Sequence, residues 1–377
     1  GTLMDCVVLM NKADEEESPA WKGAAQVMMA LTLKMGVDLF GPIPYSEALQ
    51  GADNYTPAFD EESTIYAALD GLLSEAITNL GATSLVPLAS NGDMIYKGST
   101  AKWIAAANAL RAKIALTSSE VNGTYGSAKT YAQAAMTSNA NNFNCPFDAN
   151  DPNAYNPMYQ FDDERNDIVM CSTLIDALQA DGDPRLPKIA WKAGGAYVGL
   201  APGQGGTGAE SAIGPFLGGV TDGLGRGVSV RFATAAEMQF IIAEIEADAG
   251  NVVPAQTALK AGVALSLSEM GVSNAAWKTA YDTYVDGIGT GAALLTEVMY
   301  QKWIAMAGTY EPFNDWRRLG NGHLNLELAG NSVLSGSFPQ IFPYPTSEKV
   351  YNADNVPARA DISERVWWDV ADNTPAK

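Results

Sequence analysis

The sequence is poor in the side chains that most often carry chemistry. Its three cysteines, Cys6, Cys145 and Cys171, are odd in number and far apart, and no C-x-x-C spacing occurs. This argues against a disulfide framework. His323 is the only histidine, so a zinc site lacks its usual ligands. A Ser–His–Asp or Cys–His mechanism would have to use this one residue.

Basic residues and long apolar runs are also scarce. The 23 Lys and Arg stand against 43 Asp and Glu, which gives a formal net charge of −20. A surface that follows nucleic-acid phosphates or anionic lipids needs clustered Lys and Arg, whereas neutral, polar or cationic partners stay open. No stretch is long and apolar enough to span a bilayer, and no signal peptide is visible. We expect the natural polypeptide to begin upstream of Gly1.

Helical periodicity is abundant. One stripe of apolar residues repeats with the helical period in the segment 60–81, and Thr234 and Glu237 form a capping box at the start of another helix. The same pattern predicts helices at about 19–36, 60–81, 99–117, 128–138, 169–180, 234–247, 254–270 and 290–308. The fold class is therefore mostly α. Helices in pairs are typical of a tetratricopeptide-like solenoid, but periodicity alone supports an ordinary helical bundle equally well.

The middle of the chain has a different composition. From 139 to about 227 it is rich in Asn, Asp, Pro and Gly, so we predict a long irregular segment that is packed rather than disordered. The runs "AYVGL" and "GVSVRF" favour one or two short β-hairpins. Gly203, Gly205 and Gly208 match G-x-G-x-x-G, but no helix pattern follows them, so we interpret the match as chance.

Acidic clusters raise the possibility of a glycosidase. The run "FDDERND" contains Asp162, Asp163, Glu164 and Asp167. A glycosidase needs one acid with a raised pKa and a partner at a defined separation. Adjacent surface acids do not establish such a pair, and most clusters of this kind are solvated faces or loop caps.

Aromatic residues in polar surroundings point more clearly to a site. The chain has 8 Trp and 15 Tyr, several of them in segments interpreted as loops. A flat ring beside Asp, Asn and Gln suits a sugar, which offers a C–H face and a border of hydroxyls. Each single ring is more often a core anchor than a platform. The predicted ligand-binding residues are Tyr55, Trp191, Tyr197, Trp277 and Tyr281.

Several passages, in order along almost the whole chain, carry a family resemblance. They are "ALTLKMGVDLFGPIPYSEALQG", "DMIYKGSTAKWIAAANALRAKIAL", "STLIDALQADGDPRLPKIA", "LLTEVMYQKWIAMAGTYEPFNDWRRLG" and "FPYPTSEKVYNADN". Together they resemble the SusD/RagB family of Bacteroidetes. Two features depart from its pattern: Phe338-Pro339-Gln340-Ile341 replaces the usual approach to the closing segment, and the N-terminal segment with the lipidated cysteine is missing.

The resemblance implies a single SusD-like domain over 1–377. Residues 1–140 and 228–320 would form a tetratricopeptide-like helix-pair scaffold, 141–227 an irregular insertion and 321–377 an irregular C-terminal segment. In this family the Trp316-Arg317-Arg318 cluster belongs to the scaffold, and we expect Trp103, Asn108 and Arg111 to be packing residues.

The implied function is that of a surface lipoprotein of the outer membrane, which binds an oligosaccharide or another nutrient. Such a protein partners a SusC-like TonB-dependent transporter and is not an enzyme, so no catalytic residue, metal ligand or cofactor is expected. Its contact with the membrane would be a lipid anchor outside this chain. The alternatives are a helical glycoside hydrolase that uses a pair from the 162–167 cluster, and a peptide-binding or protein-binding helical scaffold.

Overall fold

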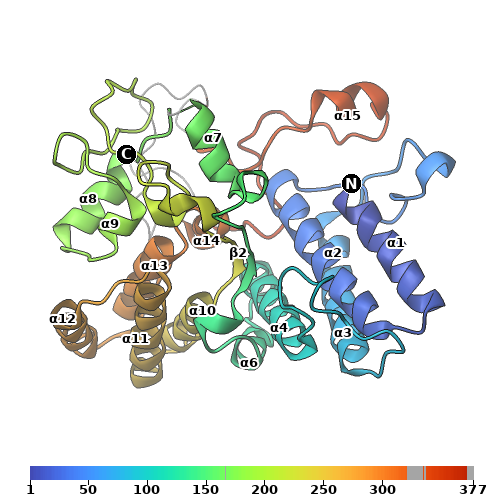
Figure 1. The fold of residues 1–377 in the computed structure, drawn as a ribbon, viewed down its shortest axis with the longest axis horizontal. Coiled ribbons are helices and arrows are strands. Elements are labelled where there is room, and N and C mark those ends of the chain that lie inside the picture. The colour runs from blue at the N-terminus through green and yellow to red at the C-terminus, as the bar shows by residue number, and fades with distance from the viewer. Residues whose placement is uncertain (166, 321–333, 335–336, 372–377) are drawn as a thin grey trace. The chain divides into compact units, whose positions relative to one another are not determined.

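The computed structural model describes residues 1–165, 167–320, 334 and 337–371. Within these residues it has fifteen α-helices and one two-stranded sheet (Figure 1). The mostly α prediction is therefore confirmed. None of the helices in the described part of the chain combines the length and the apolar character that crossing a membrane requires.

The chain divides into two compact units. The first holds Gly1–Met136, Arg317–Leu319 and Phe338–Asp372, and the second holds mainly Thr137–Trp316. Unit 1 contains α1 (Thr2–Glu15), α2 (Pro19–Phe40), η1 (Gly51–Asp53), α3 (Glu62–Gly81), α4 (Thr100–Thr117), α5 (Ser119–Asn122), α6 (Ala128–Ala134) and α15 (Thr346–Tyr351).

Unit 2 contains the second set of helices and both strands. Its irregular part has η2 (Asn139–Asn141), β1 (Phe143–Cys145), η3 (Pro152–Ala154), α7 (Pro157–Arg165), α8 (Ser172–Ala180), α9 (Leu186–Ile189), η4 (Pro215–Leu217), η5 (Leu224–Gly227) and β2 (Val230–Ala233). Its later part has α10 (Ala235–Asp248), α11 (Val252–Glu269), α12 (Ala275–Asp286), α13 (Gly291–Ala305) and α14 (Glu311–Leu319), whose last three residues cluster with unit 1.

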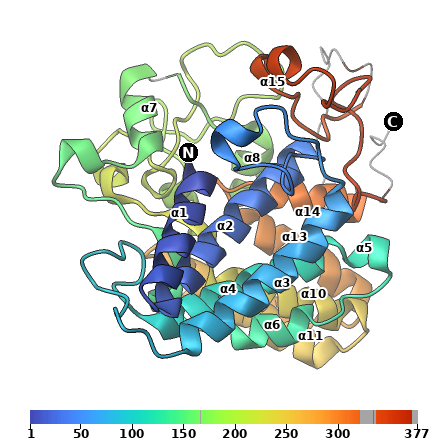
Figure 2. The same ribbon diagram turned by 90° about the vertical axis from the view of Figure 1, so that its right-hand side faces the viewer.

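Successive helices of unit 1 pack against one another. Helices α1 to α4 lie side by side in chain order (Figure 2). The predicted stripe on α3 is buried at Ile65, Leu69, Leu73, Ala76 and Leu80. The facing residue of α2 is Gly23, where a Cβ atom would lie 2.8 Å from the carbonyl oxygen of Ala76. A glycine at this position therefore lets the two helix backbones approach closely.

Unit 2 repeats this helix-on-helix arrangement. Helix α10 packs against α11 and α13. The predicted N-cap is confirmed, since the Thr234 hydroxyl accepts a hydrogen bond from the Glu237 N–H at 3.1 Å. The irregular segment is packed as expected: Ile175, Ile189 and Ile213 share a buried cluster with Met270 and Ile304. This cluster fixes the segment around α8 and α9 on the ends of α11 and α13.

The strand prediction is correct for one of the two runs. "GVSVRF" contains β2, which pairs antiparallel with β1. "AYVGL" forms only isolated bridges, in which Ala196 pairs with Ala193 and Leu200 with Cys171. After Gly208 the first helical element is the three-residue η4, which begins at Pro215. This arrangement agrees with a chance match to the dinucleotide motif.

The arginine pair after Trp316 lies inside the protein. Arg317 is fully buried and Arg318 is 1% exposed. Within unit 1, the Arg317 guanidinium donates hydrogen bonds of 2.7 Å to the carbonyl oxygens of Asp38 and Gln340, and it lies 4.5 Å from the ring centre of Trp368. It therefore ties the end of α2 to the C-terminal segment, in agreement with the scaffold interpretation.

The residues expected to pack on α4 do so. Trp103 is 4% exposed, and its indole N–H donates to the Asp93 carboxylate at 2.9 Å. Arg111 holds Asp70 with two hydrogen bonds of 2.7 and 3.1 Å. The Asn108 amide donates to the carbonyl oxygen of Ile104 on the preceding turn.

We predict that Glu62→Gln reduces the pH dependence of stability. Burial raises the pKa of Glu62 from 4.5 to about 7, although the Trp367 N–H and Arg359 act in the opposite direction. The folded protein keeps this proton at pH values where the unfolded chain releases it, so stability is lost as pH rises through about 7. In urea titrations, the loss of unfolding free energy between pH 4.5 and pH 8 should be smaller in the variant by up to about 3 kcal/mol.

Glu61→Gln, an exposed neighbour on the same turn, is the matched control and should keep the wild-type pH dependence. Equal losses in the wild type and in Glu62→Gln would contradict the assignment.

Candidate functional site

One cavity in unit 2 collects aromatic and acidic side chains. Its volume is about 510 Å³, and it is lined by Asp181, Trp277, Ala280, Tyr281, Tyr284, Glu297, Tyr300 and Gln301. This volume lies within the range of about 300–1,000 Å³ that is typical of small-ligand sites. The lining comes from three places: the residue after α8, helix α12 and helix α13.

Helix α12 supplies three of the rings. Trp277, Tyr281 and Tyr284 follow one another at intervals of four and three residues, which places them on one helix face. The rings of Trp277 and Tyr281 are stacked, with centroids 5.2 Å apart and an interplanar angle of 6°. Tyr281 is 8% exposed and Tyr284 is 56% exposed. Tyr281 therefore supports the stack from within, while Trp277 and Tyr284 border the open space.

Helix α13 places Glu297 opposite these rings. The carboxylate accepts hydrogen bonds from the Tyr281 hydroxyl at 3.0 Å, the Tyr284 hydroxyl at 3.3 Å and the Gln301 amide at 3.1 Å. Burial raises the pKa of Glu297, and these three hydrogen bonds oppose the rise because they stabilise the charged form. Burial, and then the adjacent carboxylate, raise the pKa of Tyr281 and Tyr284, so both stay hydrogen-bond donors.

Asp181 forms the third side of the cavity. It follows the last residue of α8, and its carboxylate accepts a hydrogen bond of 2.6 Å from the Tyr300 hydroxyl. Its carbonyl oxygen accepts a hydrogen bond of 3.2 Å from the indole N–H of Trp277. Trp277 from α12 and Tyr300 from α13 thus both donate to Asp181, and these bonds limit the conformational freedom of the three side chains.

A buried ion pair underlies this arrangement. Asp183 and Arg185, from the D-P-R-L turn, form a bidentate pair with a shortest distance of 2.6 Å, and neither side chain is exposed. Arg185 also donates to the Gln301 side-chain oxygen at 2.5 Å and to the Ser266 hydroxyl at 3.2 Å. Because this contact orients the amide, the NH₂ group of Gln301 faces Glu297. Two of the passages quoted above, around Arg185 and Gln301, therefore meet beneath the cavity.

The predicted ligand-binding residues do not form one group. The structure brings Trp277 and Tyr281 together, but Trp191 and Tyr197 lie elsewhere in unit 2, and Tyr55, which is 78% exposed, lies in unit 1. Tyr197 packs partly against the buried cluster around α8 and α9. The indole N–H of Trp191 is buried and has no hydrogen-bond partner within the described residues. The role of all five residues in ligand binding stays a prediction.

The interpretation of the aromatic segments as loops was partly wrong. Trp277, Tyr281 and Tyr284 lie on α12, which begins after Asn274. The side chain of Asn274 caps this helix by accepting a hydrogen bond from the backbone N–H of Trp277 at 3.0 Å. Polar residues between the rings suggested a loop, although their spacing is that of a helix face.

Of the eight residues that line the cavity, the predicted site contained only Trp277 and Tyr281. It omitted Asp181, Ala280, Tyr284, Glu297, Tyr300 and Gln301. A signal was present, because Glu297, Tyr300 and Gln301 are spaced at i, i+3 and i+4 within a predicted helix and so share a face. Nothing in the sequence indicated that this face meets α12.

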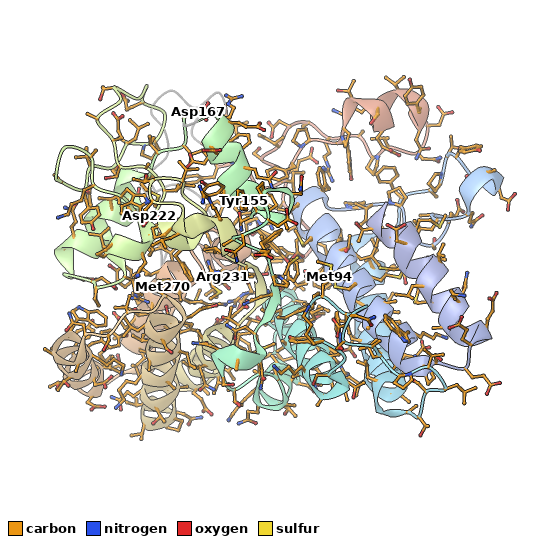
Figure 3. The ribbon with its side chains drawn as sticks, viewed as in Figure 1. Met94, Tyr155, Asp167, Asp222, Arg231 and Met270 are labelled. Atoms are coloured by element: carbon orange, nitrogen blue, oxygen red, sulfur yellow. The ribbon has the colours of Figure 1, made fainter. Side chains whose placement is uncertain are left out.

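The acidic cluster proposed for a glycosidase is dispersed around α7. Asp162 is 1% exposed and accepts a hydrogen bond from the Val220 N–H at 3.2 Å, whereas Asp163 and Glu164 are exposed. Asp167 lies past the end of α7 (Figure 3), where Arg165 donates to it at 2.6 Å. Burial raises the pKa of Asp162, the Val220 N–H opposes this rise, and Asp167 and Asp163 add to it. The other three acids are exposed, so the cluster is more typical of a solvated helix face than of a catalytic pair. His323 lies outside the described residues.

No curated protein matches this chain. Among solved structures, a chitin-binding SusD homolog from Flavobacterium johnsoniae matches with a TM-score of 0.81 and 22% identity, over 99% of this chain and 85% of that one. A second, described as a chitin-binding protein, matches with a TM-score of 0.77 and 24% identity, over 98% and 85% of the two chains. A SusD homolog from Bacteroides uniformis ATCC 8492 gives 0.79 and 20%, over 98% and 85%.

These likenesses show that the scaffold of helix pairs is the one found in SusD homologs. A family model, described as SusD-like and as "Starch-binding associating with outer membrane", matches residues 2–345. The chain belongs to this SusD-like family, which confirms the resemblance drawn from the sequence.

We predict that Arg185→Met strongly destabilises unit 2. The substitution leaves the Asp183 carboxylate buried without its partner, which typically costs about 3–5 kcal/mol. Urea unfolding followed by tryptophan fluorescence measures the change, and the double variant Asp183→Asn/Arg185→Met should recover a large part of it. Arg165→Met is the matched control, since the ion pair of Arg165 with Asp167 is exposed and worth less than about 1 kcal/mol. Similar losses in both single variants would contradict the role of the buried pair.

Proposed function

We propose that this protein binds oligosaccharides at the bacterial cell surface and does not transform them. The observation that carries the proposal is the cavity between α12 and α13, where a stack of rings lies beside two carboxylates and four hydroxyl or amide groups. An indole face packs well against the C–H face of a sugar, and the polar rim suits its hydroxyls. The family description and the chitin-binding relatives support the same ligand class.

Binding without catalysis is favoured by the way the two carboxylates are engaged. A glycosidase needs one carboxyl group that delivers a proton to the leaving oxygen. Glu297 accepts hydrogen bonds from two tyrosines and an amide, and Asp181 accepts one from Tyr300. Burial raises the pKa of Glu297, and its three donors oppose that rise and hold the group in place, which suits a fixed acceptor for ligand donors.

The proposal extends to location and partner. The family is described as associating with the outer membrane. We propose that a lipid anchor outside this chain holds the protein there and that it delivers the glycan to a SusC-like TonB-dependent transporter. Its strong negative charge suits a surface role that involves neither nucleic acid nor a direct electrostatic contact with anionic lipids.

We predict that Trp277→Ala weakens oligosaccharide binding by about 1–3 kcal/mol, the scale of one lost aromatic contact. Isothermal titration calorimetry against chito-, malto- and other oligosaccharides measures the affinity. Analysis of the recovered sugars should show the oligosaccharide intact. Tyr351→Ala, which removes a ring that is 79% exposed in unit 1, should leave the affinity unchanged. An unaltered affinity in Trp277→Ala would remove this ring from the site, and released reducing ends that are lost in Glu297→Gln would replace the binding function by hydrolysis.

The same titrations test the other proposed residues. Tyr55, Trp191 and Tyr197 lie outside the cavity, so alanine variants at these positions report whether a second platform contributes to the affinity.

We predict that the full-length protein, isolated with mild detergent from its own bacterium, co-purifies with a TonB-dependent transporter. Mass spectrometry of the purified material identifies both the partner and a lipid on the N-terminal cysteine. Recovery of the protein alone, without lipid and in the fraction free of membranes, would contradict the proposed location and partner.

A further inference from the structure

The cavity contains acids that have no internal base. Some buried acids of the described chain are paired with a base, since Asp38 lies 2.5 Å from Lys34, Asp183 lies 2.6 Å from Arg185 and Asp315 lies 2.8 Å from Lys302. Others, such as Asp93 and Asp162, are buried and accept hydrogen bonds from N–H groups of neutral residues. No ion pair within the described residues involves Asp181 or Glu297. The nearby cations are already engaged, since Arg185 is held by Asp183 and Lys278 lies 2.5 Å from Asp282. The cavity therefore has a local excess of negative charge.

The aromatic rings around these acids also have no cation against their faces. In several other places of the described chain an arginine covers an aromatic face, as Arg111 covers Tyr131 at 4.0 Å and Arg231 covers Phe216 at 4.5 Å. No cation of the described chain covers Trp277, Tyr281, Tyr284 or Tyr300. Four electron-rich rings and two carboxylates thus surround one space into which the described residues place no positive charge. Aromatic faces next to acids are the chemistry that recognises an ammonium group.

We propose that this cavity selects sugars that carry a protonated amino group, such as glucosamine units, over neutral or N-acetylated sugars. The inference rests on the proposed glycan-binding function and specifies its ligand. The sugar ring lies against the open face of Trp277, and its ammonium group donates hydrogen bonds to Glu297 and Asp181. An ammonium group has three donors and no acceptor, so it matches a site whose charged groups only accept.

The energetic reason for the selection is charge compensation. Glu297 is partly buried, and burial raises its pKa because the charged form loses hydration. A bound cation stabilises that carboxylate, whereas a neutral acetamido group leaves its charge uncompensated. Charge pairs in such surroundings are stronger than in water and weaken with salt only where solvent reaches them.

The experiment compares two oligosaccharides that differ only at the amino group. Glucosamine trimer and N-acetylglucosamine trimer are titrated calorimetrically into the whole protein, below the pKa of the sugar amino group and at low and high salt. We expect the amino form to bind roughly tenfold more tightly, the scale of a cation held by aromatic faces. Glu297→Gln and Asp181→Asn keep an acceptor oxygen for the tyrosine hydroxyls and should each reduce the preference several-fold.

Asp176→Asn is the matched control, because it removes the same charge from an exposed position on α8. It should keep the wild-type preference. Thermal unfolding of each variant shows whether it is folded, and the two cavity variants test the same prediction independently.

The outcomes separate this inference from the proposed function. A preference for the amino form that both cavity variants lose, and that Asp176→Asn keeps, supports it. Equal or tighter binding of the N-acetylated form, with affinity still dependent on Trp277, overturns the inference and leaves glycan binding intact. A preference reduced equally by Asp176→Asn overturns it too, because the preference would then reflect the net charge of −20. No binding of any oligosaccharide overturns both.

Discussion

The cavity depends on the buried pair of Asp183 and Arg185. A guanidinium without exposure needs acceptors for its donors, and each nitrogen of the Arg185 guanidinium has at least one among Asp183, Ser266 and Gln301. The pair closes the turn between α8 and α9 and at the same time fixes the amide of Gln301 on α13. This ion pair fixes the turn that carries Asp181, two residues before Asp183. Through the Gln301 amide, which donates to Glu297, it also fixes one of the hydrogen bonds of that carboxylate. The stability of the scaffold and the geometry of the site rest on the same contact.

This coupling explains how an irregular segment presents an ordered site. The segment around α8 and α9 contains only short helices, and the apolar cluster with Met270 and Ile304, together with Arg185, holds it in position. The rings of α12 then pack onto it, with the Trp277 indole bonded to the Asp181 carbonyl oxygen. Side chains restrained in this way lose little entropy when a ligand binds, which is the condition for a preorganised site.

The sequence predicted the scaffold well because a helix depends on periodicity and capping residues that lie close together in the sequence. Periodicity and caps located α2, α3, α4, α10, α11 and α13, and the capping residue Thr234 was identified correctly. Helix α12 was missed because the polar residues between its rings were interpreted as a loop, although the spacing of the rings is that of a helix face. The site was predicted less completely for a related reason. Trp277 and Tyr281 were named from their chemistry, but Asp181 is 96 residues from Trp277 in the sequence, and no local pattern reports a contact of that range. Tyr55, Trp191 and Tyr197 are also aromatic, but they do not line this cavity.

The large acidic surplus of the chain can be divided by what each acid contacts. Acids of the scaffold interior, such as Asp38, Asp183 and Asp315, have a lysine or arginine within 3 Å, and their charge is neutralised where it is buried. Exposed acids are solvated and cost little. Glu297 is partly buried, it is bonded only to neutral donors, and it lines the cavity between α12 and α13. Burial raises the pKa of Glu297, which reflects the cost of keeping its charge there without a base. A ligand that brings a positive charge stabilises this carboxylate. The cost present in the free protein is then removed on binding and adds to the affinity for a cationic sugar.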